Sequence, residues 1–287
     1  IRLGPGVTNP FSRHPALIAA AIATLDELSG GRAALGLGAG GTNHRALGVE
    51  RKKPVSVLRS AVALIRELWA GASVTIEHDV VRAVDAKLDF EARADIPIAI
   101  GARGPKTLAL AGEIADGVIV GNVASPEGWR YALERISEGV ERAGRDLDEV
   151  ELTAWFYCSL ADDAEAAIEA VRPMAATSLM TSRPVLQELG IDMPARFATV
   201  MEDLGWRLDG DAIQRAARAV PDELVHRFAL AGTPSECRAA LGRLLDEFPQ
   251  ISVVAIVPFA PGGGSVAEVV RRFIREVALE PARERVA

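Results

Sequence analysis

Residues 33–43 read Ala-Ala-Leu-Gly-Leu-Gly-Ala-Gly-Gly-Thr-Asn, a short apolar run that ends in a cluster of glycines. The pattern is typical of a buried strand that opens into a loop whose backbone a ligand can approach. Two further strand-to-glycine junctions flank it, Leu-Gly-Pro-Gly-Val at residues 3–7 and Ile-Ala-Ile-Gly-Ala-Arg-Gly-Pro at residues 98–105. Glycine or proline at the C-terminal ends of successive buried strands predicts a ligand site on one face of an α/β sheet or barrel.

The same glycines also fit the dinucleotide-binding pattern G-x-G-x-x-G, through Gly36, Gly38 and Gly41. That pattern requires a helix opening at the glycines and an acidic residue roughly 20 positions further on. Here the glycines lead into Thr-Asn-His-Arg and then Lys52-Lys53-Pro54, so no long apolar helix begins there. We therefore favour the other α/β arrangements over a Rossmann fold.

Composition narrows the class of protein. The 287 residues are 49% hydrophobic and 25% charged, as in an ordinary globular protein large enough for a full core. The net charge of -7, without a basic stripe, argues against nucleic-acid partners. No apolar run is long enough to span a membrane, and we expect no membrane partner. Cys158 and Cys237 are too few for a disulfide framework and lack metal-site spacing, which favours a cytoplasmic location.

Strands and helices alternate along the chain. Expected strands are Arg2–Val7, Ala33–Leu37, Ile96–Ile100, Gly117–Val120, Glu151–Leu160 and Ser252–Val257. Expected helices are Ala16–Leu28, Val55–Leu68, Pro105–Ala115, Pro126–Ala143, Asp162–Ala176, Thr233–Phe248 and Val266–Val277. Residues 73–90 alternate weakly and predict a hairpin-like insertion. Six buried strands with intervening helices are too many for one βαβ half, so a TIM (β/α)₈ barrel fits best.

We expect one barrel domain over residues 1–287, interrupted by an insertion at about 177–228. In that insertion Pro184, Pro194 and Pro221 break the pattern into three short helical segments. The chain starts on Ile1, without Met and inside an expected strand, so we expect the first two βα units to be lacking from this sequence.

Three groups of residues carry a family resemblance. The first is Gly4-Pro5-Gly6-Val7-Thr8-Asn9-Pro10, with Arg13-His14-Pro15 and residues 23–32. The second is Gly101-Ala102-Arg103-Gly104-Pro105, with residues 111–117, and the third is Leu230-Ala231-Gly232-Thr233-Pro234. Together they resemble the bacterial luciferase-like superfamily, in particular the deazaflavin-dependent branch that includes methylenetetrahydromethanopterin reductase. The resemblance implies a luciferase-like TIM barrel that binds coenzyme F420, or FMN in other branches, and transfers a hydride to or from a small organic substrate.

The resemblance also implies where the cofactor binds. Gly6-Val7 matches the place where the family has a non-prolyl cis peptide that forms a bulge behind the deazaflavin ring. Thr8 and Asn9 either bond the ring edge or make an Asx-type turn before Pro10. Gly38, Ala39, Gly40, Gly41 and Asn43 would line the ribityl side. Gly101, Ala102, Arg103 and Gly104 precede a helix whose N-terminal amides would attract the phosphate.

The catalytic acid or base is not identified by the sequence. His14 and His44 are weak candidates because an unperturbed imidazole titrates near neutrality. No H-E-x-x-H, C-x-x-C or G-x-S-x-G occurs, so no metal or serine-nucleophile chemistry is expected. The alternatives to an F420-dependent oxidoreductase are an FMN-dependent luciferase-like monooxygenase and a non-catalytic barrel subunit. For the enzyme we expect a homo-oligomer that acts on a small molecule.

Overall fold

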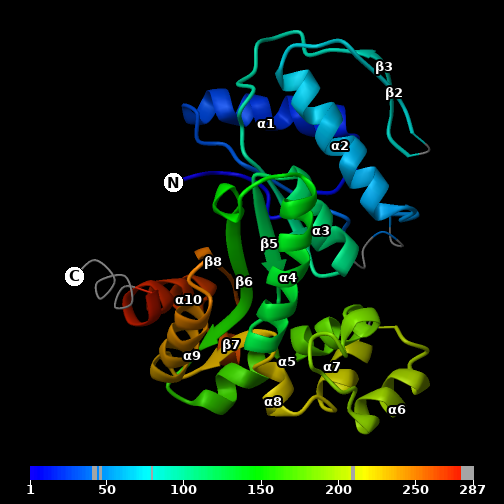
Figure 1. Cartoon of the computed structure of the whole chain (residues 1–287). Helices are drawn as coiled ribbons and strands as arrows, with labels where there is room; N and C mark the ends of the chain where they lie inside the picture. The colour runs from blue at the N-terminus through cyan, green and yellow to red at the C-terminus, as the bar shows by residue number, and fades with distance from the viewer. Residues whose placement is uncertain (41–43, 45–46, 79, 208–210, 279–287) are drawn as a thin grey trace. The chain divides into compact units, whose positions relative to one another are not determined.

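The computed structural model describes residues 1–40, 44, 47–78, 80–207 and 211–278 (Figure 1). The chain divides into two compact units. Unit 1 comprises Ile1–Ile119 and Glu134–Leu152, and unit 2 comprises Val120–Leu133 and Thr153–Ala287. Three elements contribute residues to both units, namely β5 (Gly117–Gly121), α4 (Pro126–Arg142) and β6 (Glu151–Leu160).

Unit 1 alternates helices and strands, as predicted. Its elements are α1 (Pro15–Ser29), β1 (Leu35–Gly38), α2 (Pro54–Trp69), β2 (Val74–Glu77), β3 (Arg82–Ala86), β4 (Ile98–Ala102), α3 (Pro105–Ile114) and the short 3₁₀ helix η2 (Leu147–Glu149). Strands β1 and β4 pair in parallel from Leu35↔Ile98 to Gly38↔Gly101, and β5 follows β4 in the sheet. Strands β2 and β3 form an antiparallel hairpin beside α2, which confirms the hairpin expected at 73–90 (Figure 1).

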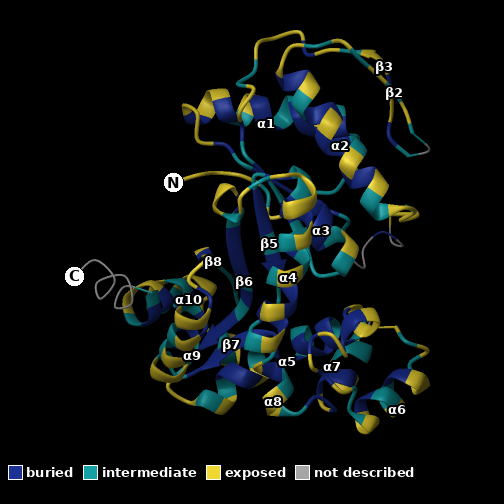
Figure 2. Cartoon of the chain, in the orientation of Figure 1, coloured by how far each residue is buried: buried dark blue, intermediate teal, exposed yellow. Residues whose placement is uncertain are grey.

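Helices α1 and α2 pack against each other, and helical periodicity predicts one apolar stripe on each. In α1 the predicted stripe is Leu17, Ile18, Ala21, Ile22, Leu25 and Leu28. The stripe of α2 is confirmed, because Val57, Leu58, Ala61, Leu64, Ile65 and Leu68 are all buried (Figure 2). The stripe of α1 is partly wrong, since Leu17 and Leu28 are exposed. The buried face of α1 instead carries Ile18, Ala19, Ile22, Ala23 and Asp26.

Asp26 explains why the buried face of α1 differs from the predicted apolar stripe. Its buried carboxylate accepts two hydrogen bonds from the guanidinium of Arg93, both 2.9 Å long, and a third of 3.0 Å from the amide of Ala33. A buried carboxylate has to be paired, so the face that carries it must turn toward its partners. The hydrogen bonds from Arg93 lower the pKa of Asp26, although desolvation opposes them.

Helix α3 packs closely on the part of α4 that belongs to unit 1. A Cβ atom added at Gly112 would lie 2.3 Å from the carbonyl oxygen of Ile136, and one added at Gly139 would lie 1.8 Å from that of Ala109. Both glycines therefore let two helix backbones touch. This contact holds α3 in place, and the N-terminus of α3 lies beside the predicted cofactor site.

Unit 2 holds the remaining elements. They are α5 (Ala164–Thr181), η3 (Arg183–Val185), α6 (Ala195–Asp203), α7 (Ala212–Ala217), α8 (Asp222–Val225), β7 (Ala229–Gly232), α9 (Pro234–Glu247), β8 (Ile251–Pro258), η4 (Pro261–Gly263), α10 (Val266–Arg272) and the π-helical turn η5 (Phe273–Ala278). Strand β6 pairs in parallel with β7 from Tyr157↔Ala229 to Leu160↔Gly232, and β8 also pairs with β6.

Several helix boundaries of unit 2 follow local signals in the sequence. The stretch Thr233-Pro234-Ser235-Glu236 predicts an N-cap at the start of α9, with proline in the first helical position and an acid in the first turn. The cap is confirmed, because Thr233 and Glu236 form a reciprocal capping box. The predicted start of α5 is wrong by two residues, since Asp163 rather than Asp162 caps it. In the described part of 177–228, α6 follows Pro194 and α8 follows Pro221, as the prolines predicted.

Candidate cofactor site

The first junction lies along the edge of β1. Residues 2–7 were expected to form a strand, but only two isolated parallel bridges form, Leu3↔Ala33 and Thr8↔Leu37. Between the two bridges the chain advances five residues from Leu3 to Thr8 but only four from Ala33 to Leu37. One residue of the first segment is therefore extra and bulges out. The expected strand is thus replaced by a bulge. The peptide bond between Gly6 and Val7 is cis, as the resemblance predicted.

Three backbone hydrogen bonds fix this bulge on β1. The amide of Gly36 donates to the carbonyl oxygen of Pro5 at 3.1 Å, and the amide of Thr8 donates to that of Gly36 at 2.9 Å. The amide of Gly38 then donates to the carbonyl oxygen of Thr8 at 2.9 Å. The chain is therefore held on both sides of Val7, a residue that is 38% exposed.

The glycines of β1 and β4 surround Val7. A Cβ atom added at Gly38 would lie 2.8 Å from Cγ2 of Val7, and one at Gly101 would lie 3.2 Å from Cγ1. A Cβ atom at Gly36 would lie 2.3 Å from the carbonyl oxygen of Pro5 and 3.1 Å from Cγ1 of Val7. The structure thus brings Val7, Gly38 and Gly101 of the prediction together. It adds Gly36, which the prediction missed.

Asn9 makes the turn that follows the bulge. Its Oδ1 accepts hydrogen bonds from the amides of Phe11, at 3.1 Å, and Ser12, at 2.9 Å. Of the two alternatives for this residue, the Asx-type turn is therefore formed. The Nε2 atom of His44 also lies 3.3 Å from Oδ1 of Asn9, and because an amide oxygen only accepts, His44 is the donor.

His44 is buried against the glycine loop rather than exposed. Gly40 has a φ of 73°, and a Cβ atom there would lie 2.3 Å from the imidazole ring. The ring also meets Phe11 edge-on, with centroids 5.6 Å apart. His44 therefore supports the turn of Asn9 and the loop after β1. Gly41 and Asn43, which were also predicted to line the cofactor, lie outside the described residues.

The third junction ends at the start of α3. Gly104 precedes Pro105 with φ -72° and ψ 146°, and as a glycine it has no side chain to cap the helix. A Cβ atom at Gly104 would have no neighbour within 4 Å among the described residues. The first turn of α3 contains no acidic residue. The Cβ position of Gly104 therefore faces open space where α3 begins. A helix N-terminus carries a partial positive charge, and here Arg103 precedes it and Lys106 lies in its first turn.

The other titratable candidates have structural surroundings. Nδ1 of His14 accepts from the amide of Ala16 and caps α1, while its Nε2 lies 2.7 Å from the carbonyl oxygen of Arg82. Both ring nitrogens are thus engaged. Burial raises the pKa of Cys237 to about 12 and moves that of Cys158 in the same direction, so neither thiol is a reactive nucleophile. Within the described part of the chain, no cluster of His, Cys, Asp and Glu could hold a metal ion.

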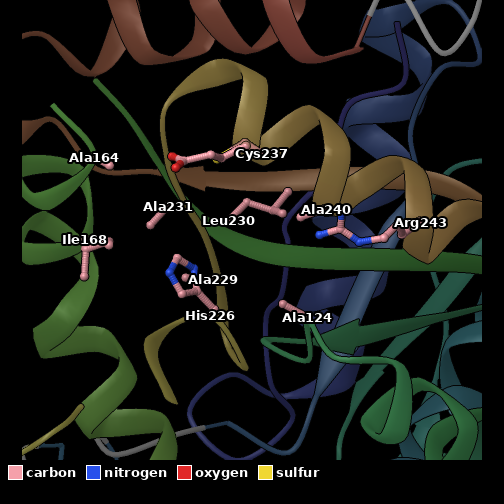
Figure 3. A pocket seen from close by; sticks show the side chains of 11 residues that line it. Ala124, Ala164, Ile168, His226, Ala229, Leu230, Ala231, Cys237, Ala240 and Arg243 are labelled. Atoms are coloured by element: carbon pink, nitrogen blue, oxygen red, sulfur yellow. The ribbon is translucent and has the colours of Figure 1, made fainter. Parts of the chain in front are cut away.

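Unit 2 has a pocket of its own, of about 320 Å³, over β7 (Figure 3). Its lining residues are Ala124, Ala164, Ile168, His226, Ala229, Leu230, Ala231, Glu236, Cys237, Ala240 and Arg243. Strand β7 and Cys237 supply buried small or apolar groups, whereas His226, Glu236 and Arg243 are exposed. No predicted site residue lines this pocket, so we do not assign the cofactor to it.

Comparison with known proteins identifies the class. The luciferase-like monooxygenase family matches residues 1–247, and the chain belongs to that family. The 5,10-methylenetetrahydromethanopterin reductase of Methanolobus tindarius is 36% identical over 280 residues, which covers 96% of this chain and 82% of the reductase. The F420-dependent glucose-6-phosphate dehydrogenase of Nakamurella multipartita is 36% identical over 208 residues, covering 70% of this chain and 60% of the dehydrogenase.

Solved structures agree on the fold. The coenzyme F420-dependent tetrahydromethanopterin reductase of Methanopyrus kandleri superposes with a TM-score of 0.79 at 31% identity, covering 96% of this chain and 82% of the reductase. An F420-dependent secondary alcohol dehydrogenase gives a TM-score of 0.75 at 20% identity and supports the fold alone. The chain therefore has the α/β fold of the luciferase-like barrels, as predicted. No helix in its described residues is long and apolar enough to cross a membrane.

Proposed function

We propose that this chain, an F420-dependent oxidoreductase of the luciferase-like family, transfers a hydride between the deazaflavin and a methylenetetrahydromethanopterin-type substrate. The observation that carries the proposal is the place in unit 1 where Val7 lies against the glycines of β1 and β4. There an exposed apolar Val7 is held on β1 and β4. In the same unit, β4 leads into the open N-terminus of α3. This combination suits a cofactor that has both a flat ring and a phosphate.

The residues present fit F420. Val7 would support the ring, and the amides at the start of α3 would hold the phosphate together with Arg103. When bound, F420 supplies the carbon that gives or takes the hydride, and the protein supplies orientation and electrostatics. Thr8, Ala39, Gly40 and Ala102 complete the proposed lining of the site. The acid or base remains unassigned, since His14 and His44 both have partners within the fold.

Other parts of the proposal concern the whole chain. Residues 1–287 would act as one barrel domain, interrupted by the insertion at about 177–228. We also propose that the protein is a cytoplasmic homo-oligomer without nucleic-acid partners. The net charge of -7 supports the absence of nucleic-acid partners, and the two buried free thiols support the cytoplasmic location. Light scattering on the purified chain tests the oligomeric state.

The proposal is tested first by cofactor binding. Purified protein is titrated with F420 and separately with FMN, and the fluorescence of each cofactor is followed. F420 should bind and FMN should bind much more weakly. Preference for FMN, with oxygen consumption once FMN is reduced, would instead establish the monooxygenase alternative. Binding of neither cofactor would leave a non-catalytic barrel.

Substrate and phosphate site are tested on the same preparation. Methylenetetrahydromethanopterin should oxidise reduced F420 under anaerobic conditions, and glucose 6-phosphate should not reduce the oxidised cofactor.

Arg103→Ala should weaken F420 binding by about 1.5 to 3 kcal/mol, or roughly ten- to a hundredfold. Arg82→Ala removes the same charge from the exposed strand β3 and should leave the affinity unchanged. Equal losses in both variants would show a general effect of charge rather than a phosphate site.

A further inference from the structure

We infer that Gly36, Gly38 and Gly101 are positioning residues that act through Val7 and do not themselves contact the cofactor. They form a seat for the Val7 side chain, and the position of that side chain sets where the ring lies. The link to the ring rests on the proposed function. The seat itself rests only on the geometry of unit 1.

The backbone does not require glycine at these three positions. None of them belongs to the positive-φ glycines of the described chain, so another residue type can adopt their conformations. The requirement is space. A Cβ atom at Gly38 would overlap Cγ2 of Val7 at 2.8 Å, and one at Gly101 would press on Cγ1 at 3.2 Å. Gly104, by contrast, has open space where its Cβ would be.

The three glycines share one face of the sheet. Gly38 and Gly101 are paired in register on neighbouring parallel strands, and Gly36 lies two residues before Gly38 on the same strand. Residues two apart on a strand, and residues in register on adjacent strands, point to the same side. A side chain on Gly38 or Gly101 would therefore meet Val7 before it could meet a molecule lying over Val7. One on Gly36 would first meet the carbonyl oxygen of Pro5, at 2.3 Å, and then Cγ1 of Val7, at 3.1 Å.

Backbone hydrogen bonds keep Val7 from moving as a whole. Residues on both sides of it are bonded to β1, through Pro5 and Thr8. An added methyl group at Gly101 must consequently push the Val7 side chain outward by a few tenths of an ångström, toward its exposed face. Hydride transfer depends steeply on alignment, since a shift of about 1 Å can cost a hundredfold in rate. We therefore expect Gly101→Ala to lower kcat about three- to tenfold while the protein stays folded.

The test is a double-mutant cycle between Gly101→Ala and Val7→Ala, with kcat and the F420 dissociation constant as readouts. Val7→Ala removes both methyl groups on which the new Cβ would press. In that background, Gly101→Ala should cost nothing further in either readout. Gly104→Ala is the matched control, and Val7→Ala should not alter its effect. If Gly101→Ala is equally harmful with and without Val7, the glycine contacts the cofactor directly and the inference is wrong.

A second readout needs no cofactor and separates this inference from the proposed function. Urea unfolding of the same four proteins, without F420, should show that Gly101→Ala lowers the midpoint and that Val7→Ala removes this loss. Gly38→Ala should lower the urea midpoint further than Gly101→Ala, and Val7→Ala should remove this loss in the same way. If wild type fails to bind F420 while this rescue appears, the proposed function fails and the seat stands. Absence of rescue overturns the seat whatever F420 does.

Discussion

Two glycine clusters of unit 1, one between α3 and α4 and one at β1 and β4, differ in what their missing side chains face. At the α3–α4 contact, Gly112 and Gly139 each face a backbone carbonyl oxygen of the opposite helix. At the junction of β1 and β4, Gly38 and Gly101 face the methyl groups of Val7. A carbonyl within a helix cannot retreat without losing its own hydrogen bond, whereas a side chain can shift. The first cluster is therefore a fixed structural contact, and the second is an adjustable one.

This difference teaches how to interpret glycines in a sequence of this kind. Gly112 belongs to the stretch 111–117 that carried part of the family resemblance, yet its role is helix packing. Gly104 represents a third situation, because open space faces it. Only that third kind leaves room for a ligand directly at the glycine. The three kinds should respond differently to the same substitution.

The largest effect should come from Gly139→Ala. The new Cβ would lie 1.8 Å from the carbonyl oxygen of Ala109, so α3 and α4 would have to separate. We expect a loss of about 3 kcal/mol or more in the free energy of unfolding, measured by urea denaturation.

The matched control is Gly242→Ala in α9, which has no neighbour within 4 Å among the described residues. There the same substitution should stabilise the chain by about 0.5 to 1 kcal/mol, because alanine favours helix. Similar losses at both positions would abolish the comparison, since they would reflect helix composition rather than contact.

A second, smaller effect should come from Asp26→Asn, which tests a buried ion pair outside both glycine clusters. The variant keeps the shape but loses the charge that Arg93 and Ala33 bond, and we expect a loss of about 2 kcal/mol near neutral pH. The pKa of Asp26 is lowered below 3.8 in the folded chain. Its contribution is therefore complete above the unfolded pKa and disappears as the pH falls through the folded one.

Urea midpoints of wild type and Asp26→Asn should consequently converge as the pH falls below about 4, the ordinary pKa of an aspartate. Asp95→Asn is the control, because Asp95 also pairs with Arg93 at 2.9 Å but is 84% exposed. It should cost less than about 1 kcal/mol. A gap between wild type and Asp26→Asn that stays constant with pH would exclude the charge as the cause.

The smallest effect should separate two substitutions at Gly104. Asp and Asn can both cap α3, so the two variants should be as stable as wild type within about 0.5 kcal/mol. Only Asp repels an anion at the helix N-terminus. We expect Gly104→Asp to bind F420 about tenfold more weakly than Gly104→Asn, by fluorescence titration. Equal affinities would mean that no phosphate lies at the start of α3.

Much of the fold could be predicted from local signals. Glu151–Leu160 was placed correctly to the residue, and α9 was recognised from its capping box. The errors occurred where tertiary contacts decide. Strand β7, only four residues long, was not recognised as a strand because its pairing with β6 is not visible in its sequence. The buried face of α1 turned toward Asp26, which periodicity alone counts as a polar residue.

The sequence predicted some of the residues that the structure brings together at β1 and β4, but not the contacts that they make there. The resemblance located the cis peptide at Gly6-Val7, and the glycine junctions drew attention to Gly38 and Gly101. Spacing could not show what a Cβ at each glycine would touch, because that depends on a neighbouring segment some 30 to 90 residues away. For this reason the contact between Gly36 and Val7 was not predicted. His44 resembled an exposed candidate until its contacts with Asn9 and Phe11 were known.

The two buried thiols have a practical consequence. Cys158 and Cys237 are 0% and 2% exposed and both belong to unit 2. Alkylating reagents can reach them only when unit 2 opens, so the rate of thiol modification measures the opening of that unit. A cysteine introduced on the surface of unit 1 would react at once and carry a dye, without prior removal of the native pair.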